Sequence, residues 1–142
     1  MSGPDSETLA AASRLIDAAL AEDVGSGDIT STAVIPADVR FAGVMAARHP
    51  MVVAGLPFAA EVFRRVVPEA TFKARAVDGE HLAAGAVLAE LEGPARGLLT
   101  AERTALNLLQ HLSGIATLTR RYVDAIREPS APGARFGELK AV

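Results

Sequence analysis

The chain of 142 residues is half hydrophobic, and its 14 lysines and arginines against 17 aspartates and glutamates leave a formal net charge of −3. This length and apolar content suit one compact soluble domain, whereas a nucleic-acid-binding protein would need a dense basic face. The absence of cysteine excludes disulfides, thiolate zinc ligands and a cysteine nucleophile. The sequence shows neither a signal peptide nor an apolar run long enough for a bilayer, so we expect a cytoplasmic protein.

The first two thirds of the chain are predicted to contain both helices and strands. Apolar residues at helical spacing predict helices, and alternating or continuous short apolar runs predict strands. In chain order we expect a helix over 6–21, a loop over 22–28, strands over 39–47 and 51–54, a helix from Pro57 to Val66, and strands over 71–77 and 87–91. Turns are expected at Asp78–Gly79 and Ala84–Gly85, because glycine readily adopts the backbone conformations of tight turns.

The last third is predicted to be helical. Thr100 is a suitable N-cap for a helix that reaches Leu112, and Gly114 is typical of a helix C-terminus. A second helix is expected over 116–127, followed by a linker-like stretch over 128–133.

The acidic loop has three carboxylates, Glu22, Asp23 and Asp28, but not the alternating ligands of a calcium loop. We interpret it as a turn with a solvated or capping carboxylate. The three histidines, His49, His81 and His111, have no zinc-ligand spacing. Neither a nucleophile elbow nor a phosphate-binding loop is present, so the sequence predicts no complete catalytic machinery within this chain.

A polar stripe on the helix after Thr100 is the strongest candidate site. Arg103, Asn107 and Gln110 fall on one face, with His111 beside them, while most of the surrounding circumference is apolar. If that helix is buried on most sides, Arg103 needs an anionic partner, because an unpaired buried guanidinium is costly. The partner could be structural, with Glu90 or Glu92 as candidates, or it could be an anionic ligand or a facing subunit.

Several motifs, in order, resemble quinolinate phosphoribosyltransferases, the carboxylating nicotinate-nucleotide pyrophosphorylases. The matching stretches are Glu22–Thr30, Ala54–Pro57, Asp78–Gly79 with Gly85, Leu91–Ala95, Thr100–Asn107 and Leu112–Thr117. Together they extend over most of the chain, from about Leu9 to Arg135. Five or more motifs in the family's order are far more specific than any one of them.

The resemblance implies an α+β fold with a hammerhead-type N-terminal domain, a small mixed sheet with flanking helices, over residues 1–114. Residues 115–142 would then be a helical segment and a truncated lead-in to an absent phosphoribosyltransferase barrel. The family's activity is that of a pentosyltransferase, nicotinate-nucleotide diphosphorylase (carboxylating). It converts quinolinate and phosphoribosyl pyrophosphate into nicotinate mononucleotide, pyrophosphate and CO2 in NAD synthesis, with Mg²⁺.

The resemblance also implies how the site residues act. In the family, the N-terminal domain of one subunit covers the barrel of its partner, and the arginine at the position of Arg103 reaches a substrate carboxylate in trans. Glu102 and Asn107 match the same motif and are given support roles. Lys140 is a candidate remnant of the barrel motif that binds quinolinate and the phosphates, and the Mg²⁺ ligands are expected outside this chain.

We therefore expect the chain to act within a homodimer or higher homo-oligomer, or with a separate barrel subunit, and to be inactive alone. Two alternatives remain open at this point. One is a non-catalytic module, from a truncated or split gene, that pairs with a barrel subunit. The other is a relative that acts on a different anionic ring. No nucleic-acid or membrane partner is expected.

Overall fold

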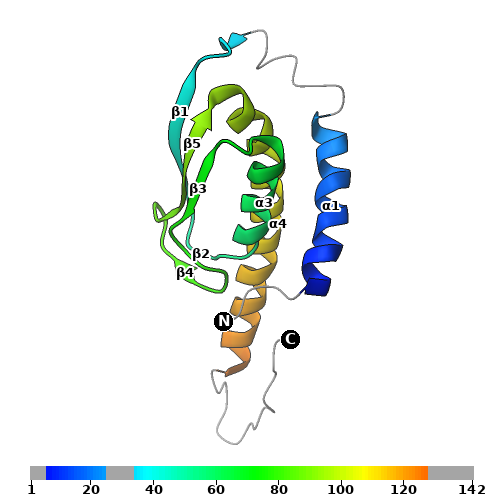
Figure 1. The fold of residues 1–142 in the computed structure, drawn as a ribbon. Coiled ribbons are helices and arrows are strands. Elements are labelled where there is room, and N and C mark those ends of the chain that lie inside the picture. The colour runs from blue at the N-terminus through cyan, green and yellow to red at the C-terminus, as the bar shows by residue number, and fades with distance from the viewer. Residues whose placement is uncertain (1–5, 25–33, 128–142) are drawn as a thin grey trace, which may run out of the picture.

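The computed structural model of the chain describes residues 6–24 and 34–127, and these form three layers. A sheet, the helices α3 and α4, and the helix α1 lie side by side in that order (Figure 1). The elements are α1 (Ser6–Val24), β1 (Arg40–Ala46), β2 (Met51–Val52), α3 (Leu56–Val66), β3 (Thr71–Ala74), β4 (His81–Leu82), β5 (Val87–Pro94) and α4 (Ala95–Arg127). None of the described helices combines the length and the hydropathy needed to cross a bilayer.

The three-stranded sheet has β5 at its centre, flanked by β1 and β3, and β2 pairs separately with β4. All of these pairs are antiparallel, so the described sheets are antiparallel rather than mixed. Between β3 and β5 the chain passes through the two predicted turns, with β4 between them. Gly79 (φ 90°) and Gly85 (φ 85°) supply the left-handed conformations there.

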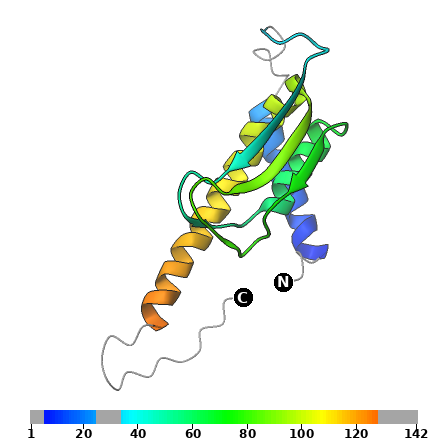
Figure 2. The same cartoon turned by 90° about the vertical axis from the view of Figure 1, so that its left-hand side faces the viewer.

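The core lies between the sheet and the helices α3 and α4, which cover the same face of the sheet (Figure 2). Its apolar side chains come from every layer, including Ile16 of α1 and Ala105 and Leu109 of α4. Phe63 of α3 and Phe72 of β3 bring the helix and the sheet together, with ring centroids 5.7 Å apart. The predicted α+β architecture is thus confirmed.

The helix α4 is a single helix of 33 residues, so two predicted boundaries are wrong. The Thr100 hydroxyl does not cap a helix start but donates to the carbonyl of Arg96 within the helix, at 2.9 Å. Gly114 does not end the helix, because side chains on both sides of it bind the rest of the fold. The predicted division of the chain after residue 114 falls inside this helix.

The β2–α3 connection is bound to α4 by two hydroxyl side chains. Ser113, 2% exposed, accepts from the amide of Ala54 at 3.0 Å and donates to the carbonyl of Ala54 at 3.1 Å. One turn later the Thr117 hydroxyl accepts from the amide of Val52 at 2.9 Å. Together these bonds satisfy backbone groups that have no strand partner at those atoms, and they fix the position of α4 along its axis.

The N-terminus of α3 is capped from a distance by Asp78. Its carboxylate accepts from the amides of Gly55, at 2.8 Å, and Leu56, at 3.0 Å. Gly55 has φ 99°, and a Cβ there would lie 2.7 Å from Cδ1 of Leu112 on α4. Glycine is therefore favoured by the backbone conformation, and a larger residue would also have to displace the end of the Leu112 side chain. Three of the motif stretches thus meet at one place in the fold.

Helix α1 is docked on the other side of α3 and α4. Ile16 is its one buried residue among those described, at 1% exposure. Arg65 of α3 binds the carboxylates of Glu61 and Asp17 and both the hydroxyl and the carbonyl of Ser13. The helix runs to Val24, three residues further than predicted.

Gly114 gives a direct test of the continuous α4. Because a Cβ at this position would meet no atom within 4 Å, Gly114→Ala removes only the backbone entropy cost of a helical glycine. We expect the free energy of unfolding, measured by urea denaturation, to rise by about 0.5–1 kcal/mol. A loss of stability would contradict the continuous helix.

The carboxylate of Asp78 can be tested in the same way. Asp78→Ala leaves two amides at the start of α3 without an acceptor, and we expect the free energy of unfolding to fall by about 1–2 kcal/mol. Asp38→Ala is the matched control, because Asp38 is exposed and makes no contact that the structure shows. Equal unfolding midpoints for the two variants would refute the capping role.

The ion pairs of α3 predict a pH dependence of stability. Hydrogen bonds from Arg64 and then Arg65 lower the pKa of Glu61 to about 2, against desolvation, which raises it. Because the folded-state pKa lies below the ordinary value of 4.5, the stabilisation is present above pH 4.5 and is lost as the pH falls toward about 2. Glu61→Gln should cost roughly 1 kcal/mol at pH 7.

In urea titrations at several pH values, the difference between the wild-type chain and Glu61→Gln should shrink below pH 4.5. A difference that stays constant down to the acid transition would contradict this assignment.

Candidate functional site

Arg103 lies on the outward face of α4, with 78% of its side chain exposed. The expectation that this helix is buried on most sides is therefore wrong. Its buried face is narrow and is formed by small or apolar residues such as Ala101, Ala105 and Leu109. Leu99, one turn before Arg103 on the same side of the helix, is 43% exposed. The guanidinium is thus presented at the surface of this chain and does not sit inside it.

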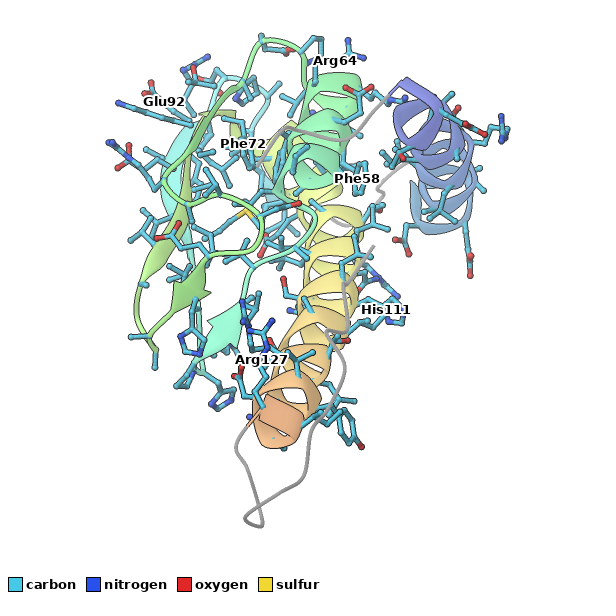
Figure 3. All side chains as sticks on the ribbon, turned by 90° about the horizontal axis from the view of Figure 1, so that it is seen from below. Phe58, Arg64, Phe72, Glu92, His111 and Arg127 are labelled. Carbon is cyan, nitrogen blue, oxygen red and sulfur yellow. The ribbon has the colours of Figure 1, made fainter. Side chains whose placement is uncertain are left out.

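The structure pairs Arg103 with Asp23 at the end of α1, with Nε 3.5 Å from Oδ1. Neither of the predicted structural partners, Glu90 and Glu92, pairs with Arg103. Glu90 takes two hydrogen bonds of 2.8 Å from Arg75, which lower the pKa of Glu90 and raise that of Arg75. Glu92 is exposed on the side of the sheet away from α1 (Figure 3).

Asp23 has a second partner on α4. The hydroxyl of Thr104 donates to its Oδ2 at 2.8 Å, and Thr104 is 1% exposed. The interpretation of Asp23 as a solvated or capping carboxylate in a loop is therefore wrong, because Glu22 and Asp23 belong to α1. Residues 25–28 of that predicted loop, among them Asp28, lie outside the described residues.

The other residues of the predicted stripe are also exposed. Asn107 follows Arg103 by one turn on the same face of α4, and Gln110 and His111 continue it. His111 projects from α4 on the side where α1 lies (Figure 3). Glu102, although adjacent in sequence, points to a different surface. Lys140 lies outside the described residues.

Glu102 lines a groove of about 990 Å³ between β1 and α4. Its walls are mainly apolar, and Phe41 at its edge is 56% exposed. Polar side chains stand along the helix side and at the end of β1, namely Glu102, Gln110, Arg121, Arg48 and His49. The groove and the Arg103 surface are thus adjoining surfaces of α4 that share Gln110.

Metal-ligating side chains do not converge in the part of the chain that the structure describes. Within residues 6–24 and 34–127, no three histidines, aspartates or glutamates gather around one point. His49, His81 and His111 lie on a loop, on β4 and on α4 respectively. The described residues therefore do not fit a Mg²⁺ site.

Asp23 and Thr104 are the site residues that sequence reasoning missed. One signal was available, because α1 has no basic residue in its last turn and ends on Glu22 and Asp23. Acidic side chains oppose the partial negative charge at a helix C-terminus. An acid retained there indicates a partner elsewhere in the fold, which here is α4.

Fold and site together define an α+β domain that presents Arg103 at the surface of a long helix. A family model described as the N-terminal domain of quinolinate phosphoribosyl transferase matches residues 28–113. The nicotinate-nucleotide pyrophosphorylase [carboxylating] of Mycobacterium leprae is 44% identical over 124 residues, which cover 85% of this chain and 44% of that protein. A probable enzyme of the same name from Methanocaldococcus jannaschii is 45% identical over 112 residues, 78% of this chain and 38% of its own length.

Solved structures give the same result. NadC from Streptococcus pyogenes superposes with a TM-score of 0.81 at 37% identity, over 89% of this chain and 45% of that chain. The nicotinate-nucleotide pyrophosphorylase of Francisella tularensis superposes with a TM-score of 0.78 at 36% identity, over 82% and 42%. The chain thus spans less than half the length of these relatives. It belongs to the family of quinolinate phosphoribosyl transferase N-terminal domains.

Proposed function

We propose that the chain supplies the N-terminal part of an enzyme that forms nicotinate mononucleotide, pyrophosphate and CO2 from quinolinate and phosphoribosyl pyrophosphate. The names of its relatives support this, among them the carboxylating pyrophosphorylase of Mycobacterium leprae and a quinolinate phosphoribosyltransferase [decarboxylating] of Nicotiana tabacum. The observation that carries the proposal within this chain is the exposed guanidinium of Arg103 on α4.

Arg103 would bind one carboxylate of quinolinate across a subunit interface. A planar guanidinium matches a carboxylate with two parallel N–H···O bonds, and such charge-assisted bonds are strong where water is excluded. Because Arg103 is 78% exposed, a ligand or a second subunit can reach it from outside this chain. This favours a role in trans over a structural role in the core.

Asn107 and Glu102 would have support roles. Asn107 stands one turn from Arg103 on the same face, where its amide can donate a further hydrogen bond to an anion. Glu102 faces the groove beside β1, so it would act on the surface that meets the neighbouring domain rather than on the substrate.

The remaining groups of the reaction would come from outside the described residues. The reaction must position two anionic substrates and stabilise a pyrophosphate leaving group, which one arginine cannot accomplish. We assign no step to Mg²⁺, because the described residues do not fit it. A homo-oligomer or a separate barrel subunit in the cytoplasm would complete the site.

A hybrid enzyme tests the proposal. The chain is joined to the part of the Mycobacterium leprae relative beyond the matched region, and formation of nicotinate mononucleotide is measured. We expect turnover, and we expect Arg103→Ala to lower kcat/KM for quinolinate at least ~10-fold, about 1.4 kcal/mol of transition-state stabilisation.

Arg75→Ala is the matched control for this experiment, because it removes the same charge from an exposed arginine that binds Glu90 on the sheet. It should leave the kinetics unchanged. A folded hybrid without turnover, or an Arg103→Ala hybrid with unaltered kinetics, would contradict the proposed function.

A further inference from the structure

Asp23 occupies a position near the end of α1 that is electrostatically unfavourable for an acidic residue. Asp23 lies in the last turn, where the exposed carbonyls carry a partial negative charge, and no basic residue accompanies it there. Its carboxylate is nevertheless largely covered, with 19% of the side chain exposed. A group placed at such a local disadvantage is expected to serve a contact elsewhere in the fold.

The two oxygens of the Asp23 carboxylate have different partners. One accepts a hydrogen bond that fixes the carboxylate, and the other faces the guanidinium of Arg103. Oδ2 accepts the hydroxyl of Thr104 at 2.8 Å, and Thr104 is 1% exposed and fixed in the packing of α4. Oδ1 lies 3.5 Å from Nε of Arg103. The anchor therefore holds the carboxylate in place independently of the arginine.

The ion pair approaches the guanidinium from its Nε side. The contact lies between Oδ1 of Asp23 and Nε of Arg103, and among the described residues the structure shows no other ion pair and no hydrogen bond of Arg103. A guanidinium held at Nε keeps its two terminal nitrogens for another ligand, and these form one of the two edges that match a carboxylate.

We propose that Asp23 is a positioning residue for Arg103, holding the guanidinium at Nε so that its terminal nitrogens face the carboxylate of quinolinate. This rests on the proposed function of Arg103. An exposed arginine samples many rotamers, and fixing it before the substrate arrives removes part of the entropy cost of binding. The role belongs to Asp23 and, behind it, to Thr104.

The docking of α1 then becomes part of the site. Asp23 reaches Arg103 only while α1 lies against α3 and α4, and that position depends on Ile16 and on the contacts of Arg65 with Ser13 and Asp17. A change in α1 docking would be felt at Arg103 through Asp23.

Asp23→Asn tests the proposal with little risk to the fold. The amide oxygen of asparagine can still accept from Thr104, and loss of the charge relieves the end of α1. In the hybrid enzyme described above, we expect the KM for quinolinate to rise about tenfold. The KM for phosphoribosyl pyrophosphate should stay within about twofold.

Glu22→Gln is the matched control, because it removes the same charge from the same turn of α1 at an exposed residue for which the described part of the structure shows no contact. It should leave the KM for quinolinate unchanged. In an Arg103→Ala background, Asp23→Asn should add nothing further, because the positioned group is gone. A merely structural role would instead change both KM values and act equally in both backgrounds.

The contact itself can be observed in the chain alone by nuclear magnetic resonance. We expect the Nε–H signal of Arg103 to move and to exchange faster with water in Asp23→Asn, while that of Arg75, bound to Glu90, stays in place. An unchanged Arg103 signal would overturn the proposal.

The kinetic outcomes separate the two proposals. If Arg103→Ala leaves kcat/KM for quinolinate unchanged, the proposed function fails. If Arg103→Ala lowers kcat/KM and Asp23→Asn leaves the KM for quinolinate unchanged, the proposed function stands and the positioning role of Asp23 is refuted.

Discussion

The bonds between α4 and the β2–α3 connection determine where the other elements lie. The backbone groups of Val52 and Ala54 are satisfied by Thr117 and Ser113, and a buried backbone group left without a partner would cost about 1–3 kcal/mol. A helix shifted by one residue would lose all of these bonds. The register of α4 against the sheet is therefore fixed by hydrogen bonding as well as by the less directional packing of the core.

This fixed register serves both faces of α4. On the inner face Leu112 closes on Gly55, so that α3 can begin where Asp78 caps it. On the side that faces the end of α1, Thr104 and Arg103 contact Asp23. The same helix thus connects the sheet, the cap of α3 and the exposed arginine, which explains why the motif stretches, far apart in the chain, lie close together in space.

Local patterns predicted the elements whose formation depends on local chemistry. The strands near 39–47 and 87–91, the helix starting near Pro57 and the turn at Asp78–Gly79 are confirmed, because periodicity and glycine placement act within a few residues. The predicted helix end at Gly114 is wrong because the hydrogen bonds of Ser113 and Thr117 to the β2–α3 connection override the local preference of glycine. The sequence pattern of α4 identified Arg103 as a candidate site residue. It did not identify Asp23 as its partner, because a contact between residues some 80 positions apart produces no periodic pattern in the sequence. The role of Arg103 toward a substrate stays a prediction.

Because α4 is one continuous helix, the number of residues between two of its side chains fixes their relative positions. With a rise of about 1.5 Å and a rotation of about 100° per residue, each side chain on it has a fixed height and azimuth relative to Ser113. Deleting one residue between Arg103 and Ser113 would turn the arginine by more than a quarter of a circle, away from Asp23, while leaving its chemistry intact. The spacing along this segment is therefore as much a determinant of the site as the identity of the arginine.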